Sequence, residues 1–274
     1  MARYLHLYYA FLRNSLLRDM SFRANFIVEC ISSMSWTAMM MGFYLLLFNY
    51  AHEIAGWEKW DFFAFLATSL IVNSLVEMFF MPNAENFSEL IRKGGLDFLL
   101  LKPVDTQFLV SLQRIDWSSL ANVFLGVVFL GISMFQLAND PVNPKIITPQ
   151  MFVLYPFYVL CGVAILYSLM IGLAATSIFL GRNQSLYDFW FYVTTFSRYP
   201  MEIYTANAFG RGLWFFFLFV IPVLVVINVP ARVVARPAGD WWLAPWALVA
   251  TALSLVVSRW FFQLALSRYR SASS

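Results

Sequence analysis

NFSELIRKGGLDFLLLKP, residues 86–103, is a charged stretch between two apolar runs, each of which is long enough to cross a membrane. A bilayer core requires about 20 consecutive apolar residues in a helix, which this stretch does not supply. Its mixture of apolar and charged residues instead predicts a short amphipathic helix on a membrane surface, with Gly94 and Gly95 as a hinge. A structured, charged loop of this kind in a polytopic protein predicts a docking site for a partner.

The composition indicates an integral membrane protein. Of the 274 residues, 61% are hydrophobic and only 12% are charged, whereas a soluble domain is about 45–50% apolar and about 25% charged. The net charge is only +3, and no basic stretch is interleaved with aromatic residues, so no nucleic acid is expected as a partner. The two cysteines, Cys30 and Cys161, lie in apolar runs and predict no disulfide.

The apolar runs predict an all-α polytopic membrane protein with six transmembrane helices. Five spans are clear from their length. They are residues 24–48, 62–81, 117–138, 151–180 and 241–266. Because no internal repeat or low-complexity segment is visible, residues 1–274 are expected to form a single membrane domain. Residues 1–21 would be an interfacial helix and residues 22–274 the six-helix part.

The sixth crossing falls between residues 186 and 230, where two interpretations are open. Residues 187–196 form a short aromatic run, and residues 213–229 form an apolar run that Pro222 interrupts. Either the first run is interfacial and the second spans, or the first is a short span and the second is a re-entrant hairpin on the far side. Both give one net crossing and a broken region before the last helix. Irregular backbone at membrane depth is tolerated only where protein buries it or where it lines a cavity.

Residues 3–20 predict an amphipathic helix. Arg3, Arg13 and Arg18 recur on one side of it, and apolar residues fill the other. This pattern is typical of a helix that lies in the membrane interface with its arginines towards the headgroups of membrane lipids. The alternative is a helix packed on the protein's own loops. Arginines spread in this way also argue against a cleavable signal peptide.

The positive-inside rule orients the protein. With the N-terminus in the cytoplasm, twelve of the 18 Lys and Arg residues fall inside and four fall outside, while Arg198 and Arg211 stay undecided. The four outside residues are Lys59, Lys145, Arg232 and Arg236. Both termini and residues 86–103 are therefore expected in the cytoplasm.

The usual signatures of catalysis and of nucleotide or metal binding are absent from the sequence. There is no phosphate-binding G-x-x-x-x-G-K-[ST] loop, no H-E-x-x-H and no G-x-S-x-G, and the only histidines are His6 and His52. We therefore expect no catalytic residue, no metal site and no cofactor bound by this chain.

Polar residues at membrane depth are candidate functional residues. Ser69, Asn73 and Glu77 follow one another at intervals of four, which places them on one helix face. They predict a translocation path or a subunit interface, and the alternative is an ordinary contact between packed helices.

Three further charged residues lie in the region of the uncertain crossing. They are Asp188, Arg198 and Glu202. If this region is re-entrant, they could pair with one another or line an exit path for substrate. The alternative is a solvated loop at the membrane interface.

Five segments resemble the permease subunits of type-2 ABC exporters. ELIRKGGLDFLLLKPVD at residues 89–105 is similar to the loop that holds the coupling helix of that family. The other similar segments are AGWEKWDFFAF at 55–65, SRYPMEIY at 197–204, FVIPVLVVINVPA at 219–231 and SRYRSASS at 267–274. Their order and spacing extend over essentially the whole chain. They are most similar to a bacterial branch in which the permease accompanies a second, different permease and an ATPase.

The resemblance implies a mechanism. In that superfamily the coupling helix docks into a separate ATP-hydrolysing subunit, whose closure switches the permeases between inward- and outward-open states. The docking residues it implies in this chain are Glu89, Leu90, Arg92, Lys93, Asp97 and Lys102, with Gly94 and Gly95 allowing a tight bend. ATP and Mg would bind to the partner ATPase subunits. A second permease subunit would complete a homodimer or heterodimer in a bacterial inner membrane.

The expected function is export of a hydrophobic, lipid-like or drug-like substrate by alternating access, with ATP hydrolysed on the separate subunit. A membrane-embedded enzyme that modifies lipid and a non-catalytic membrane scaffold are the alternatives. The enzyme would need a cluster of Asp, Glu or His near one interface, and the sparse histidines and scattered carboxylates argue against it.

Overall fold

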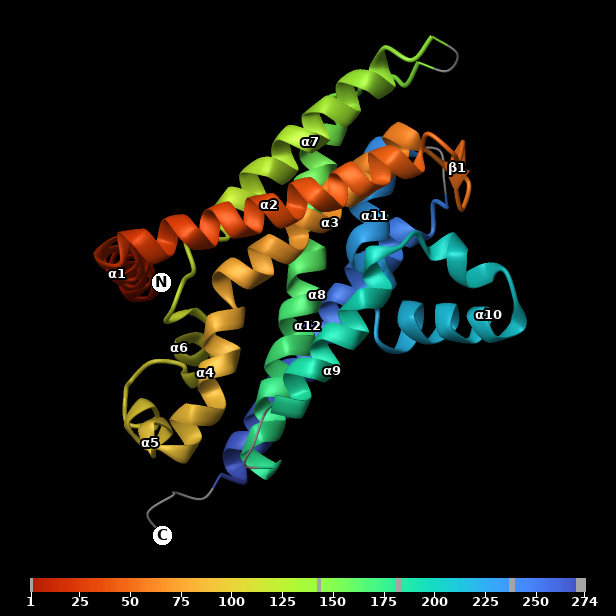
Figure 1. Cartoon of the computed structure of the whole chain (residues 1–274). Coiled ribbons are helices and arrows are strands. Elements are labelled where there is room, and N and C mark those ends of the chain that lie inside the picture. The colour runs from red at the N-terminus through yellow and green to blue at the C-terminus, as the bar shows by residue number, and fades with distance from the viewer. Residues whose placement is uncertain (1, 142–143, 181–183, 237–239, 270–274) are drawn as a thin grey trace.

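The computed structural model describes residues 2–141, 144–180, 184–236 and 240–269, which form a bundle of long helices (Figure 1). Its α-helices are α1 (Ala2–Ser21), α2 (Arg23–Leu47), α3 (Lys59–Phe79), α4 (Met81–Arg92), α5 (Gly95–Leu100), α6 (Thr106–Leu112), α7 (Leu120–Ala138), α8 (Met151–Leu180), α9 (Gln184–Thr195), α10 (Ala208–Phe215), α11 (Val223–Ala235) and α12 (Leu243–Ser267). Two short 3-10 helices, η1 (Phe196–Arg198) and η2 (Met201–Thr205), and a π-helical turn, η3 (Phe216–Val220), interrupt the later part. The strands β1 (Glu53–Ile54) and β2 (Trp57–Glu58) pair as one antiparallel hairpin.

The predicted spans coincide with the long helices. Within the described residues, five helices are long and apolar enough to cross a membrane, and one bent pair adds a sixth candidate. The structure therefore confirms the prediction of an all-α polytopic membrane protein. We refer below to the two ends of the bundle as the hairpin end, where β1 and β2 lie, and the α5 end, where α5 lies (Figure 1).

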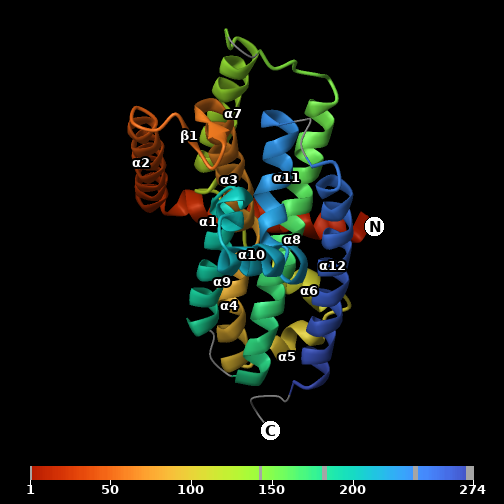
Figure 2. The same cartoon turned by 90° about the vertical axis from the view of Figure 1, so that its right-hand side faces the viewer.

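α3 forms the centre of the bundle. It contacts α7, α8 and α11, and 72% of the most apolar 18 residues in the run Lys59–Arg92, which α3 begins, are buried. The corresponding fractions are 11% for α2 and 22% for α12, which lie at the edges of the bundle (Figure 2). Helices this apolar and this exposed would be unstable in water, so their outer faces require lipid or another protein.

α8 and α11 approach each other closely at Gly162. A Cβ atom built on Gly162 would lie 2.5 Å from the carbonyl oxygen of Val226. Small residues allow backbones to approach in this way, and the close packing that results helps to hold helices together inside a membrane. Gly162 therefore positions α11 against the core.

Residues 86–103 form the end of one helix and a second short helix rather than a single surface helix, so the predicted extent of the helix is corrected, while the hinge at Gly94 is found. Residues 86–92 belong to α4, which continues α3 so that Lys59–Arg92 forms one run of 34 residues. At 1.5 Å per residue this run is about 51 Å long, which exceeds the bilayer core of about 30 Å. Pro82 does not end the helical run, because it lies in the first turn of α4, where a missing N–H is tolerated.

The region from α9 to α11 contains a re-entrant hairpin. α10 with η3 and α11 form a pair of helices bent by 86°. Glu202, before α10, lies 2.5 Å from Arg232, near the end of α11, so the bent pair leaves and returns to the same end of the bundle. α9 begins at the α5 end, just after α8, and leads towards the hairpin end (Figure 1). This geometry favours the interpretation in which residues 187–196 lie in the crossing segment and residues 213–229 are re-entrant.

α1 packs in part on the protein's own loops. Ser15 Oγ accepts a hydrogen bond of 3.1 Å from the N–H of Ile115, and Arg18 Nη2 donates one of 3.2 Å to the carbonyl of Ile115. Another side of α1 exposes Leu5 and Tyr9, at 69% and 66%. The loop-packed alternative therefore describes one face of α1. The exposed apolar face is what an interfacial helix requires, and its lipid contact stays a prediction.

Candidate functional site

The segment from α4 to α6 packs on the α5 ends of α8 and α12 through an apolar core of its own. Phe87 of α4 is fully buried, and its ring centroid lies 5.9 Å from that of Phe262 on α12. The other buried members of this core are Leu96, Leu99, Leu109, Val110, Ile171, Ala174, Ala175 and Ala265. Full burial of a large apolar side chain contributes about 1.5–3 kcal/mol. The segment is therefore held firmly against the two long helices.

Gly94 allows the chain to reverse between α4 and α5, as the hinge prediction requires. Its φ is 69°, in the left-handed region that side chains with a Cβ rarely adopt. Gly95 lies so close to α4 that a Cβ atom on it would be 3.0 Å from Leu90 Cδ2. Leu90 is half-buried and packs against the apolar core of this segment. Leu90, one of the predicted docking residues, therefore packs against the turn on its buried side.

The outer side of α5 exposes apolar side chains. Phe98 is 71% exposed and Leu101, directly after α5, is 82% exposed. Leu96 and Leu99 are buried on the opposite side. Phe98 and Leu101 were not among the predicted docking residues, although each follows a buried leucine by two residues. A large exposed apolar pair rimmed by charge is typical of a protein contact surface.

Charged side chains lie at the end of α4, in the first turn of α5 and directly after α5. Glu89 Oε1 lies 2.7 Å from Lys93 Nζ and 3.9 Å from Arg92 Nη2, and all three residues are exposed. Lys102 is exposed beyond α5, whereas Asp97 is half-buried in the first turn of α5. The structure thus brings the predicted charged residues together around one turn. We call the exposed surface of Glu89, Arg92, Lys93, Phe98, Leu101 and Lys102 the α5 tip.

Asp105 connects the base of this turn to α12. Arg259 donates two hydrogen bonds to its carboxylate, of 3.0 Å to Oδ1 and 2.5 Å to Oδ2. Asp105 Oδ1 also accepts a 3.0 Å hydrogen bond from the N–H of Phe108 and so caps α6. Gln107 accepts from Arg259 at 2.9 Å and donates to the Tyr167 hydroxyl of α8 at 2.9 Å. The loop is therefore linked to both α8 and α12. These links were not predicted from the sequence.

The hydrogen bonds from Arg259 lower the pKa of Asp105, and the N–H of Phe108 lowers it further. A lowered folded-state pKa means that the ionised carboxylate stabilises the fold above the unfolded-state pKa of about 3.9. This stabilisation is lost as the pH falls through the folded-state value. We expect the difference in melting temperature between the wild type and Asp105→Asn to be constant from pH 7 to 5 and to shrink below about pH 4. Differential scanning fluorimetry in detergent measures it, and a difference that does not shrink between pH 5 and the lowest pH at which both proteins stay folded would contradict the assignment.

On the polar face of α3, Asn73 forms hydrogen bonds with Ser69 of the same helix. Asn73 Nδ2 donates to the carbonyl of Ser69 at 2.8 Å and to Ser69 Oγ at 3.2 Å. Glu77, one turn further, is exposed. The structure thus satisfies the donors of Asn73 within its own helix and leaves the carboxylate of Glu77 at the surface. A translocation path or subunit interface at these residues stays a prediction.

A cluster of ion pairs holds the bent helix pair of the re-entrant hairpin at the end of the bundle where β1 and β2 lie. Arg232 Nη2 lies 2.5 Å from Glu202 Oε1, and Arg232 Nη1 lies 2.8 Å from Asp240 Oδ2. Arg236 lies 3.7 Å from the same Glu202 oxygen, and its guanidinium lies 4.6 Å from the ring centroid of Trp57 in β2. The sequence pattern indicated Arg232 and Arg236 only as orienting charges, because their shared partner Glu202 lies 30 residues before Arg232 in the chain.

Arg198 does not pair with Glu202. Its guanidinium lies over the ring of Phe191, 5.3 Å from the centroid, while Glu202 is engaged by the arginines of α11. Pairing between Arg198 and Glu202 is therefore not found. The side chain of Asp188 lies outside the described residues.

No group of three or more His, Cys, Asp or Glu side chains in the described ranges is placed to hold a metal ion. Arg259 and Asp105 bind each other, and the carboxylates of Glu202 and Asp240 are engaged by arginines. These charged side chains therefore link segments of the chain to one another.

The comparison with family models agrees with this architecture. The model described as "ABC-2 family transporter protein" matches residues 34–273, which include the spans, the α5 tip and the re-entrant hairpin. No curated protein and no solved structure matches the chain. Members of this family supply the membrane-spanning permease subunit of ABC transporters, and they typically work with ATPase subunits. The chain belongs to the ABC-2 family of transporter proteins.

Proposed function

We propose that this permease exports a hydrophobic or lipid-like substrate, and that a separate ATPase subunit drives it by docking on the α5 tip. The observation that carries the proposal is the contrast between the two sides of this segment. The tip exposes Phe98 and Leu101 at 71% and 82%, while the base is bound to α12 through Asp105 and Arg259. A partner that pushes on the tip would therefore move transmembrane helices.

The proposal includes an orientation of the protein in the membrane, with the α5 end in the cytoplasm. In this orientation, Arg92 and Lys93 of the α5 tip and Arg259, which binds its base, would lie on the cytoplasmic side, as the positive-inside rule requires. Both chain ends would then be cytoplasmic and the membrane would be a bacterial inner membrane. ATP and Mg would bind to the ATPase subunits. A second permease, identical or different, would complete the translocation path, to which Ser69, Asn73, Glu77, Arg198 and Glu202 are the candidate contributors.

Reversal of two charges on the tip tests the docking. We expect Arg92→Glu combined with Lys93→Glu to lower co-purification of the ATPase subunit several-fold, because both side chains are exposed and their reversal places like charges in the contact. Phe98→Ser should act in the same direction by removing an exposed apolar anchor. Pull-down of the ATPase from detergent-solubilised membranes measures the effect.

The matched control is Arg211→Glu. Arg211 is also exposed, but it lies in α10 of the re-entrant hairpin, away from the α5 tip (Figure 1). It should leave co-purification unchanged. If the tip variants retain the ATPase as well as Arg211→Glu does, with equal amounts of protein in the membrane, the docking assignment is wrong.

A further inference from the structure

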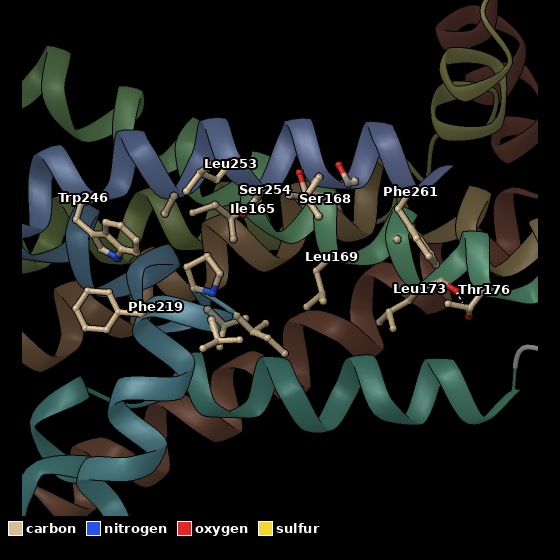
Figure 3. Close-up of a pocket in the computed structure, with 18 residues that line it drawn as sticks. Ile165, Ser168, Leu169, Leu173, Thr176, Phe219, Trp246, Leu253, Ser254 and Phe261 are labelled. Carbon is tan, nitrogen blue, oxygen red and sulfur yellow. Dashed lines mark hydrogen bonds between the residues drawn. The ribbon is translucent and has the colours of Figure 1, made fainter. Parts of the chain in front are cut away.

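An apolar groove runs along α12 at membrane depth. It has a volume of about 570 Å³ and lies between α8, α12 and the turn of the re-entrant hairpin (Figure 3). Its lining residues include Ile165, Leu169 and Gly172 of α8, Phe219 and Pro222 at the turn, and Trp246, Leu253 and Phe261 of α12. From Trp246 to Phe261 the groove follows α12 for about 22 Å at 1.5 Å per residue. This is longer than one leaflet of the hydrocarbon core, which is about 15 Å thick.

The groove is open along its length. Its floor is buried, with Ile165 and Ala250 both 2% exposed. Its rim is not, because Val220, Leu253 and Val257 are 59%, 54% and 57% exposed. In Figure 3, α9 runs along the side opposite α12, and no described residue of α9 lines the groove. The exposed rim therefore allows a ligand to enter sideways from the surrounding membrane.

Most hydrogen-bond donors in the walls are already engaged. Ser168, Thr176 and Ser258 each donate their hydroxyl to a carbonyl of their own helix, at 2.8, 2.7 and 3.1 Å. Trp246 Nε1 donates to the carbonyl of Leu218 at 2.9 Å. No lining residue is ionisable at neutral pH. A polar or charged ligand would lose its water and gain no partner from these groups, which costs several kcal/mol, whereas an alkyl chain loses nothing.

Gly172 keeps the groove open in the middle. A Cβ atom on Gly172 would meet no atom within 4 Å, in contrast to the crowded Gly162 on the same helix. A larger side chain at this position can therefore project into the groove without displacing a neighbouring helix. This makes Gly172 a suitable position for blocking the groove while preserving the fold.

We propose that the groove binds one alkyl chain of a phospholipid that enters laterally from the bilayer, and that such a lipid is the transported substrate. The assignment of the lipid as the transported substrate rests on the proposed export function, whereas the binding of the alkyl chain in the groove does not. An open, uncharged, membrane-facing channel longer than one leaflet fits an extended hydrocarbon chain better than a compact polar solute. The headgroup would remain outside the groove.

Photo-crosslinking tests the binding site. The full chain with its ATPase is placed in lipid nanodiscs that contain a phosphatidylethanolamine with a diazirine in the acyl chain. After irradiation we expect mass spectrometry to find the adducts on groove residues of α8 and α12. Gly172→Leu should reduce these adducts at least five-fold. Gly131→Leu is the matched control, because Gly131 has equally open space but lies on α7, outside the groove. Adducts that Gly172→Leu does not reduce would overturn the binding site.

ATP-dependent movement of a fluorescent phosphatidylethanolamine across proteoliposome membranes tests the substrate assignment. We expect Gly172→Leu to lower it at least five-fold relative to Gly131→Leu while the ATPase still co-purifies. Loss of adducts with wild-type lipid movement would overturn the substrate assignment. If no ATPase associates with the wild-type chain, the export function fails, and the crosslinking result still decides the binding site.

Discussion

Gly162→Val is expected to destabilise the protein more than any other single substitution considered. A Cβ atom at this position would lie 2.5 Å from the carbonyl oxygen of Val226, and backbone cannot move aside as a flexible side chain can. Overpacking of this kind costs typically 1–3 kcal/mol and occasionally more, and we expect the upper end. At about 2–4 °C per kcal/mol, the melting temperature should fall by roughly 6–12 °C.

Gly172→Ala provides the control on the same helix. Its Cβ meets open space, and replacing a helical glycine by alanine stabilises by about 0.5–1 kcal/mol. We expect an unchanged or slightly higher melting temperature. Fluorescence-detected size-exclusion chromatography after heating measures both variants. Equal melting temperatures for Gly162→Val and Gly172→Ala would show that α8 and α11 are not in close contact at Gly162.

Arg259→Ala is expected to uncouple ATP hydrolysis from transport. The substitution removes both hydrogen bonds to the Asp105 carboxylate and one to Gln107, so the base of the α5 tip loses its link to α12. Charge-assisted hydrogen bonds contribute about 1.5–3 kcal/mol, and partial exposure of this pair places it at the low end. About 1.4 kcal/mol corresponds to a factor of ten. We expect transport to fall about tenfold while ATPase association and ATP hydrolysis persist.

A double-mutant cycle separates coupling from folding. If Arg259 and Asp105 act through each other, Arg259→Ala combined with Asp105→Ala should transport little worse than either single variant. Lipid movement and ATP hydrolysis are measured on the same proteoliposomes. Parallel loss of hydrolysis and transport would contradict a coupling role, because it would indicate loss of docking or of folded protein.

The membrane-spanning helices were predictable because they depend on local composition. Residues 151–180 were predicted as a span and form α8 with the same bounds. The other clear spans shifted by only a few residues at their ends. Burial of apolar side chains in lipid and internal satisfaction of backbone hydrogen bonds act on each helix separately, so length and hydropathy suffice.

The charged stretch at residues 86–103 was predicted in part. Its charge and its Gly-Gly hinge were visible, but its division into the end of α4 and a separate α5 was not. Hydropathy ends the span near Pro82, whereas the helix continues to Arg92 because its backbone hydrogen bonds continue outside the membrane. Which leucines of α5 face inward depends on the positions of α8 and α12, and these are not encoded in the stretch itself.

The sequence alone predicts a polytopic helical membrane protein with a charged loop and no visible nucleotide-binding or catalytic motif. Which charges meet depends on how the helices pack. Asp105 pairs with Arg259, 154 residues away, and Glu202 pairs with Arg232, 30 residues away, rather than with its neighbour Arg198. The physical reason is that hydropathy is a property of each segment, whereas an ion pair requires two segments to be packed side by side. Packing depends on small residues such as Gly162 and on the turn of the re-entrant hairpin.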